Sequence, residues 1–206
     1  MTTKSGYEKM VSGELYEAPD WDLIEMQVEA KKKLDRLNAA PSWDMANRTA
    51  MLRDQLGSFG ESFVLSPITW EYGKHIHIGD GVFINFECVF LDGADVRIGD
   101  GTAIAPRVMF LTAGHPVDPV ERQRHDPVTG MLNGAMCINK PITIGKNCWI
   151  GAGTMIVGGV TIGDGTTIGA GSVVTRDNPP GVLAAGNPCR VIRPASAKTT
   201  LAANAA

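Results

Sequence analysis

The stretch ITIGKNCWIGAGTMIVGGVTIGDGTTIGAGSVV, residues 142–174, decides the fold of this chain. An aliphatic residue recurs at every sixth position, at Ile144, Ile150, Ile156, Ile162, Ile168 and Val174. A helix repeats every 3.6 residues and a strand every two, so neither explains this period. A chain that makes a short strand, turns and repeats places one aliphatic residue inward on each side. Three such sides form a triangular coil of about 18 residues, and stacked coils bury a continuous aliphatic column.

The same period occurs earlier in the chain. Ile78, Ile84 and Phe90 are six residues apart, and after a register shift of two the pattern resumes at Ile98 and Ile104. A β-sandwich with glycine-rich turns is the alternative, but its strands would alternate with a period of two. We therefore predict a mainly β fold, a hexapeptide-repeat solenoid that forms a parallel β-helix.

A polar, helical segment precedes the repeats. The spacing predicts one helix from Asp20 as its N-cap and a second with Ser42 as cap and Gly57 as stop. We expect three parts: a helical N-terminal cap over 1–60, the β-helix over 61–194, and a flexible tail over 195–206.

The composition excludes several functional classes. A formal net charge of −3 gives no electrostatic basis for binding nucleic acid or an anionic membrane. No apolar run approaches the roughly 20 residues that span a bilayer. The first residues, MTTKSGYEKM, contain no apolar core of a secretory signal, so we expect a cytoplasmic protein. Its four cysteines are then expected to be buried thiols, at Cys88, Cys137, Cys148 and Cys189.

The repeat stops between residues 112 and 141, where charge rises and prolines appear. A long loop that leaves a rigid solenoid is either a tolerated insertion or a functional element. It contains Gly114-His115-Pro116 directly after the last regular coil. An imidazole is well suited to proton transfer near neutral pH, so His115 is a candidate general base. The alternative is a histidine that fills a surface loop.

Several motifs in fixed order carry a family resemblance: MVSGELYEAPD near the N-terminus, IAPRVMFLTAGHPVD, CWIGAG and AAGNPCRVIR. Over nearly its whole length the chain resembles the maltose/galactoside O-acetyltransferases of the hexapeptide-repeat acyltransferase superfamily. The resemblance implies a left-handed β-helix and a homotrimer with each active site between two subunits. It also implies direct acetyl transfer from acetyl-CoA, as co-substrate, to a sugar hydroxyl (maltose, glucose or galactoside type). His115 would be the general base, and neither a metal nor a permanently bound cofactor is implied.

The resemblance assigns residues to both substrates. On the acceptor side it implies Asn85, Asp92, Glu71, Tyr72 and Glu17, and a loop residue that is either Met136 or Cys137. On the acetyl-CoA side it implies Trp149, Ala152, Ala170, Thr175, Arg176, Arg190 and Arg193. A backbone amide near Gly151-Ala152 is a candidate donor to the thioester oxyanion.

Other readings stay open at this point. The γ-type carbonic anhydrases share the coil and bind zinc through three histidines, but His75, His77, His115 and His125 do not fall in that ligand pattern. A non-catalytic β-helix scaffold is a second alternative. A xenobiotic or other non-sugar acceptor is a third, because the segment RHDPVTGMLNGAM lengthens the loop beside the predicted acceptor site.

Overall fold

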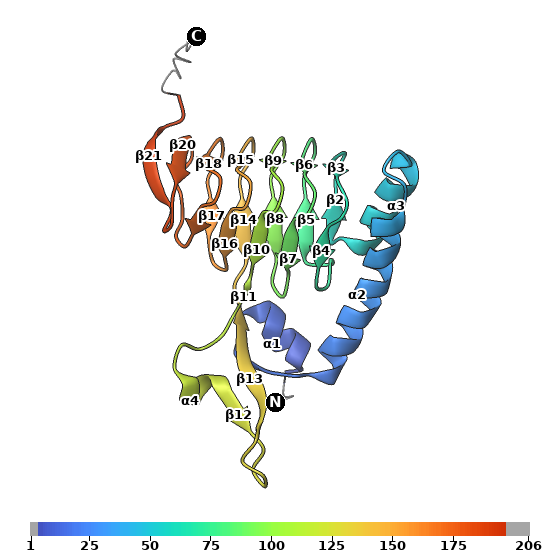
Figure 1. Ribbon diagram of the computed structural model, residues 1–206, viewed down its shortest axis with the longest axis vertical. Helices are drawn as coiled ribbons and strands as arrows, with labels where there is room; N and C mark the ends of the chain where they lie inside the picture. The colour runs from blue at the N-terminus through green and yellow to red at the C-terminus, as the bar shows by residue number, and fades with distance from the viewer. Residues whose placement is uncertain (1–3, 197–206) are drawn as a thin grey trace, which may run out of the picture.

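The computed structural model describes residues 4–196. Three parallel sheets form the sides of a triangular solenoid, and helices cover its N-terminal end (Figure 1). The prediction of a mainly β hexapeptide solenoid is confirmed. Over the described residues no helix combines the length and the apolar character that crossing a bilayer requires.

Each side of the solenoid is a stack of short strands. The first side contains β2 (Ser58–Phe59), β5 (Ile76–Ile78), β8 (Val96–Ile98), β14 (Ile142–Ile144) and β17 (Thr161–Ile162). The second side contains β3 (Phe63–Val64), β6 (Phe83–Ile84), β9 (Ala103–Ile104), β15 (Trp149–Ile150), β18 (Thr167–Ile168), β20 (Val182–Ala185) and β21 (Arg190–Pro194). The third side contains β4 (Thr69–Trp70), β7 (Val89–Leu91), β10 (Met109–Leu111), β16 (Met155–Val157) and β19 (Val173–Val174).

The period of six arises because each side turns one residue into the shared interior. On the second side Ile104, Ile150 and Ile168 are in register, and each is fully buried. On the third side Phe90 and Phe110 stack with ring centroids 4.5 Å apart. Full burial of such a side chain is worth about 1.5–3 kcal/mol, so the column supplies the main stabilisation of the solenoid.

The N-terminal cap contains α1 (Gly6–Ser12), α2 (Trp21–Ala39) and α3 (Met45–Gln55). Asp20 caps α2 as predicted, accepting a hydrogen bond from the Leu23 amide. The predicted cap of α3 at Ser42 is wrong: Asp44 accepts from the amide of Asn47 instead, where a carboxylate also suits the helix dipole. The predicted stop at Gly57 is confirmed: α3 ends at Gln55 with Leu56 as its C-cap, so Gly57 is the first residue beyond the cap.

Helices α2 and α3 lie against the first coil and close the open end of the apolar column (Figure 1). Leu34, Leu37 and Leu52 join the core of the solenoid. The buried guanidinium of Arg48 donates to the carbonyl oxygens of Leu37 and Val64, 3.0 and 3.1 Å away. The cap is therefore anchored by both apolar packing and charged hydrogen bonds to backbone.

The segment that breaks the repeat is ordered into secondary structure, where the sequence predicted only a loop. It forms β11 (Ala113–Gly114), α4 (Pro119–Arg122), β12 (Gln123–His125) and β13 (Leu132–Asn139). β12 and β13 make an antiparallel hairpin that projects from the solenoid (Figure 1). β1 (Tyr16–Ala18) pairs with β13, so the N-terminal segment holds the base of the hairpin.

At the other end, β20 and β21 pair antiparallel and finish the second side. Residues 197–206, most of the predicted flexible tail, lie outside the described residues. The four cysteines are free and buried, as predicted.

Candidate functional site

Two corners of the solenoid contain most of the predicted site residues. The turns that lead from the second side to the third contain Asn85, Ala152 and Ala170; we call this edge the alanine corner. The turns that lead from the third side to the first contain Asp92 and the departure of the segment with His115; we call this edge the histidine corner. The two corners border the third side on its two edges, so one chain does not bring the two groups together.

His115 is exposed and follows β11 directly. Its Nδ1 lies 2.8 Å from the backbone carbonyl oxygen of Met136 on β13. Because a carbonyl only accepts, Nδ1 carries the proton in this contact, and Nε2 keeps its lone pair. The Sγ atom of Cys137 lies 3.6 Å from the same Nδ1. The ring is thus oriented by β13 and can accept a proton at Nε2.

β13, the strand that orients His115, is held in place by Tyr16 on β1. Tyr16 is opposite Cys137 in the β1–β13 ladder, and the side-chain amide of Asn139 donates to its hydroxyl at 3.1 Å. Burial raises the pKa of Tyr16 to about 12 and also raises the pKa of the Cys137 thiol. Gly93 is needed here, because a Cβ at this position would lie 2.4 Å from the Asn139 amide nitrogen. Cys137 is buried in this layer, whereas Met136 is partly exposed.

Asp92 is fully buried, so its carboxylate does not face solvent in the single chain. Its Oδ1 accepts from the backbone amides of Glu71 and Tyr72, at 3.0 and 2.9 Å. Burial raises the pKa of Asp92, although the Tyr72 amide and the charge of His75 oppose that shift. The geometry gives Asp92 the role of positioning the backbone that carries Glu71.

Glu71 is partly buried beside this carboxylate. Burial, with a further contribution from the charge of Asp92, raises the pKa of Glu71 to about 7. A carboxyl group with this pKa is partly protonated at neutral pH and can both donate and accept a hydrogen bond. Tyr72 is buried, and its hydroxyl accepts from the Gln27 amide at 3.0 Å, so it contributes mainly packing.

His75 ties the first helix to the same corner. Its Nδ1 contacts the backbone oxygen of Asp92 at 2.5 Å, and its Nε2 lies 3.2 Å from the hydroxyl of Tyr7 on α1. Both ring nitrogens are therefore engaged in hydrogen bonds to protein groups. Across residues 4–196 no three His, Cys, Asp or Glu side chains are arranged to hold a metal ion.

Glu17 lies on the exposed side of β1, opposite Met136 in the ladder. Its carboxylate is 4.0 Å from the guanidinium of Arg124 on β12. Glu17 is thus close to His115, because both are next to Met136 on β13. Its ion pair with Arg124 on the hairpin is long and exposed, so it contributes little energy.

The alanine corner presents small residues and one large aromatic. Asn85, Ala105 and Gly151 follow one another along the corner. The amide of each donates to the carbonyl oxygen of an isoleucine on the next coil, Ile104, Ile150 and Ile168 respectively. A Cβ at Gly151 would lie 2.5 Å from the amide nitrogen of Ala170, so only glycine allows the coils to stack here. Trp149, beside this corner on the second side, is 59% exposed.

Backbone and side-chain hydrogen bonds decide which groups at this corner are free. The Gly151 amide donates to the Ile168 carbonyl at 2.8 Å, which removes it as a donor to a substrate. The Ala152 amide makes no such bond among the described residues. The side-chain oxygen of Asn85 accepts from the Phe86 amide at 2.9 Å, a turn contact that orients the side chain.

The remaining predicted residues divide between the corners. Arg190 is opposite Ala185 at the end of the alanine corner, and Arg193 is opposite Leu183 on the second side. Thr175 and Arg176 follow β19 and lie exposed at the end of the histidine corner.

The outer face of the third side is apolar. One column contains Val89, Met109, Met155 and Val173, and a second contains Leu91, Leu111 and Val157. Each of these side chains is exposed or partly exposed. The outer face of the first side is polar by comparison, with His77, Arg97, Thr143 and Thr161 in register. The apolar face thus lies between the two groups of site residues.

Sequence reasoning missed Tyr7, Tyr16 and Asn139, which support the site from α1, β1 and β13. A tyrosine in a short N-terminal strand gave no periodic signal, because β1 has only three residues. The hydrogen bond between the side chains of Tyr16 and Asn139 joins segments more than 100 residues apart, so no local sequence pattern indicates it.

Family models match two regions of the chain. The bacterial transferase hexapeptide model (six repeats) matches residues 141–176, and the maltose acetyltransferase hexapeptide capping motif matches residues 9–60. Nodulation protein L of Rhizobium meliloti is 43% identical, with 92% of this chain and 98% of that protein covered. The crystal structure of a maltose O-acetyltransferase from Clostridium difficile 630 is 39% identical, with a TM-score of 0.84 and coverage of 94% and 98%. A galactoside acetyltransferase in complex with coenzyme A is 35% identical, with a TM-score of 0.82 and coverage of 94% and 92%.

Proposed function

Because the chain belongs to the maltose/galactoside O-acetyltransferase family of hexapeptide-repeat acetyltransferases, we propose that it transfers the acetyl group of acetyl-CoA to a sugar hydroxyl. The observation that carries the proposal is the orientation of His115. Its Nδ1–H is directed to the Met136 carbonyl, and its exposed Nε2 remains an acceptor. Coenzyme A in the galactoside acetyltransferase structure supports acetyl-CoA as the co-substrate.

In this reaction Nε2 of His115 takes the proton from the acceptor hydroxyl as its oxygen attacks the thioester carbonyl carbon. The C–S bond then breaks, and the imidazolium returns the proton to the CoA thiolate, so the products are an acetate ester and CoA. The hydrogen bond to Met136 holds the ring through both proton transfers. General-base catalysis of this kind contributes about 10²- to 10⁴-fold in rate.

We assign acceptor recognition to groups at both corners. Glu71 supplies a carboxyl that donates or accepts, and Glu17 supplies an exposed carboxylate near β13. Asn85 supplies its amide nitrogen, because its oxygen is engaged in the turn. Asp92 and Tyr72 support these groups without facing the acceptor. Asp92 fixes the Glu71 backbone, and Tyr72 contributes packing. Met136, rather than the buried Cys137, is the loop side chain that can reach a substrate.

We assign acetyl-CoA to the alanine corner. Ala152 and Ala170 leave room for the pantetheine arm against the backbone, and Trp149 offers an exposed ring to it. The free Ala152 amide is the candidate donor to the thioester oxyanion. Four residues are proposed near the CoA phosphates: Arg190 and Arg193 of the chain that supplies the alanine corner, and Thr175 and Arg176 from the histidine corner of the adjoining subunit. Arginine suits these oxygens through charge-assisted bonds.

The separation of the corners supports a homotrimer. Each chain presents a histidine corner and an alanine corner, on opposite edges of an apolar third side. Packing that face against neighbours removes apolar surface from water and brings the histidine corner of one chain to the alanine corner of the next. Closed threefold symmetry then makes three equivalent sites, each built by two chains.

The test is CoA release from acetyl-CoA by the wild type and His115→Ala, with a panel of sugars, thiogalactosides, amino sugars and chloramphenicol. We expect transfer to a sugar that falls about 10²-fold or more in the variant. Transfer to chloramphenicol alone would replace the sugar with a non-sugar acceptor. Transfer that survives in His115→Ala would remove the base assignment, and no transfer with no acetyl-CoA binding would indicate a scaffold.

A further inference from the structure

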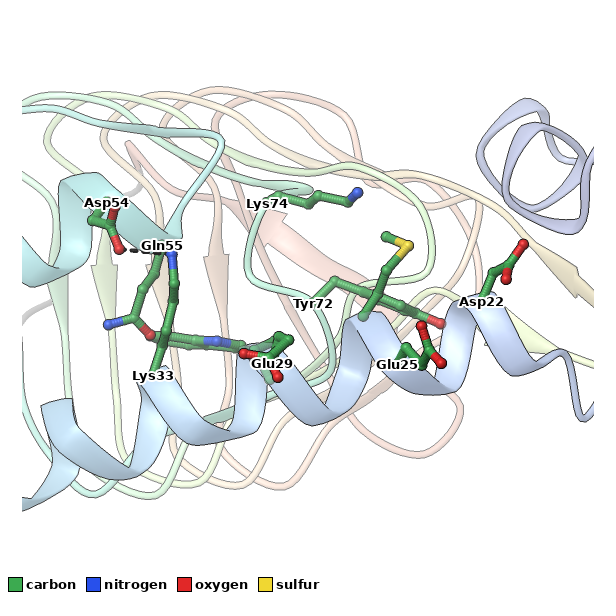
Figure 2. Close-up of a pocket in the computed structure, with 11 residues that line it drawn as sticks. Asp22, Glu25, Glu29, Lys33, Asp54, Gln55, Tyr72 and Lys74 are labelled. Atoms are coloured by element: carbon green, nitrogen blue, oxygen red, sulfur yellow. Dashed lines mark hydrogen bonds and ion pairs between the residues drawn. The ribbon is translucent and has the colours of Figure 1, made fainter.

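The proposed acceptor site does not coincide with the cavity shown in Figure 2. That cavity, of about 680 Å³, lies between α2, the end of α3 and the first coil. Neither Asn85, Glu71 nor His115 lines it. Recognition of the acceptor therefore depends on side chains at the open corners of the solenoid, and a side chain that is already oriented there is a candidate for this role.

One position of the alanine corner has a left-handed backbone in four successive coils. It is occupied by Glu87, Arg107, Gly153 and Gly171, with φ angles of 58°, 62°, 67° and 70°. The amide of each donates to a carbonyl oxygen of the preceding coil, those of Pro67, Phe86, Pro106 and Ala152 respectively. The four residues are therefore structurally equivalent, and the chain uses glycine at this position in two coils and a charged residue in the other two.

The backbone favours glycine at this position. Glycine adopts a positive φ without steric cost, whereas a side chain with a Cβ is strained there. A Cβ at Gly153 or Gly171 would meet no atom within 4 Å, so the φ angle, and not lack of space, accounts for those glycines. Glu87 and Arg107 are thus kept against a backbone preference, and residues held in this way cluster at functional sites.

Glu87 and Arg107 form an ion pair that leaves several of their polar atoms free. Nε of Arg107 donates to one carboxylate oxygen of Glu87 at 2.5 Å. The two side chains are 43% and 69% exposed, and an ion pair this exposed adds little to stability. Within residues 4–196 neither the terminal nitrogens of Arg107 nor the second oxygen of Glu87 has a hydrogen-bond partner. The pair therefore does not offset the backbone strain, but it holds the guanidinium in a fixed orientation.

This pair adjoins the proposed active site. Glu87 is two residues beyond Asn85, and Arg107 lies between β9 and β10, in the coil that leads to His115. With the threefold axis of the proposed trimer along the solenoid, rotation from one chain to the next leaves the position along the axis unchanged. The histidine corner of one chain then meets the alanine corner of its neighbour at the same coil. Glu87 and Arg107 therefore face His115 of the partner subunit.

We propose that Glu87 and Arg107 determine acceptor specificity by binding two neighbouring hydroxyl groups of the sugar; this inference rests on the proposed function. The terminal N–H groups of Arg107 donate to the two hydroxyl oxygens, in the planar fork that a guanidinium presents. The second oxygen of Glu87 accepts the proton of one hydroxyl. A sugar that carries a carboxylate fits less well, because Glu87 already balances the charge of Arg107.

The test measures binding of methyl β-D-glucoside and methyl β-D-galactoside by calorimetry in the presence of CoA, which cannot transfer an acetyl group. We expect Arg107→Gly and the double variant Glu87→Gly/Arg107→Gly to bind the preferred sugar about three- to tenfold more weakly. Their melting temperatures should equal or exceed that of the wild type, because glycine relieves the strain. The control Asn147→Gly changes another non-glycine residue with positive φ, 54°, at the corner between the first and second sides, and should bind the sugar as the wild type does.

Deoxy sugars test the contact itself. In the wild type the 2-, 3- or 4-deoxy analogue that lacks a contacted hydroxyl should bind about fivefold or more weakly than the parent sugar. In the double variant the same two sugars should bind within about twofold of each other. An equal deoxy effect in both proteins, or unchanged sugar affinity in both variants, would overturn the inference.

Two further outcomes separate this inference from the proposals on which it rests. Dissociation of the variants to monomers in sedimentation velocity, with the wild type trimeric, would overturn the specificity role and place the pair in the subunit interface. A wild type that binds neither sugar would overturn the proposed function, and this inference with it. Sugar binding by the wild type that the variants retain would overturn the inference alone.

Discussion

The imidazole Nδ1 of His115 lies 2.8 Å from the backbone carbonyl oxygen of Met136, and this contact joins the outgoing and returning ends of the segment that leaves the solenoid. β11 and β13 pair at the base of the segment, at Gly114 and Ile138, so the two residues are held by a sheet ladder. A histidine on a free loop would sample many orientations. Here the pairing of β11 with β13 fixes the position of the ring. The contact with the Met136 carbonyl places the ring proton on Nδ1.

His115→Asn tests whether proton transfer or only ring position is needed. The asparagine amide can keep a hydrogen bond to the Met136 carbonyl but cannot take a proton near pH 7. We expect kcat to fall about 10²-fold or more, as in His115→Ala. The KM for acetyl-CoA should stay within about twofold, since binding at the alanine corner is unaffected. A steady-state assay with substantial activity in His115→Asn would contradict the base assignment.

Shortening the hairpin tests whether it selects the acceptor. His125 is opposite Leu132, so replacing residues 126–131 by Asn-Gly closes the hairpin with a two-residue turn. We expect a folded protein in which the KM for the acceptor changes and the KM for acetyl-CoA does not. The melting temperature and both KM values are the measurements. An unchanged acceptor profile across the panel would assign the long hairpin no part in specificity.

Glu71→Gln should alter the pH dependence of stability. The folded pKa of Glu71, about 7, is raised from its ordinary value of 4.5, so the folded state binds the proton more tightly than the unfolded state. The stability from this proton is fully present below pH 4.5 and is lost as the pH rises through 7. At about 1.4 kcal/mol per pKa unit the upper bound is about 3.5 kcal/mol, and solvent screening of the partly exposed carboxyl reduces it to about 1–2 kcal/mol.

The measurement is urea unfolding of wild type and Glu71→Gln at pH 5 and pH 8. The variant should gain about 1–2 kcal/mol relative to wild type between the two pH values. Glu61→Gln, at an exposed carboxylate paired with Arg53, serves as the control. Parallel pH profiles of wild type and Glu71→Gln would show that Glu71 titrates normally.

Met109→Glu tests the third side as the subunit interface. Met109 lies in the apolar column, where burial of a carboxylate against a neighbour would be costly. We expect a monomer by sedimentation velocity. Acetyl transfer should be lost, because each site needs the histidine corner of one chain and the alanine corner of another. Thr143→Glu, on the outer face of the first side, should remain trimeric and active. A trimeric Met109→Glu would place the interface elsewhere.

Trp149→Ala tests acetyl-CoA binding at the alanine corner. The ring is 59% exposed, so its removal should change the free energy of unfolding by less than about 0.5 kcal/mol. We expect the KM for acetyl-CoA to rise about two- to twelvefold, since an aromatic contact is worth about 0.5–1.5 kcal/mol. Calorimetry with CoA gives the same quantity without an acceptor. An unchanged affinity would make Trp149 a surface residue of the coil.

The β-helix could be predicted from the sequence because its cause is local and repeated. Ile150 and Ile168 are 18 residues apart, one coil, and every coil requires the same inward aliphatic residue. The N-cap of α2 at Asp20 was predictable for a similar reason, since a cap interacts within three residues. The predicted N-cap of α3 was wrong because Ser42 and Asp44 are both good capping residues and lie only two positions apart, so the local sequence did not distinguish them.

The site was only partly predictable, because its energetics are non-local. His115, Glu71 and Asn85 carry recognisable motifs, but nothing in the local pattern indicates that Asp92 is fully buried beneath Glu71. The raised pKa of Glu71 depends on that burial, which is a property of the assembled corner.

The sequence by itself determined the solenoid, its helical cap and the position of the break at His115. The residues that produce these features interact only with near neighbours in the chain or with the next coil. Only the tertiary structure decided which nitrogen of His115 is free, that Tyr16 and Asn139 support it, and that the two groups of site residues lie on opposite edges of the third side. These depend on β1 and β13 meeting across more than 100 residues, and on side-chain directions that no period of six specifies.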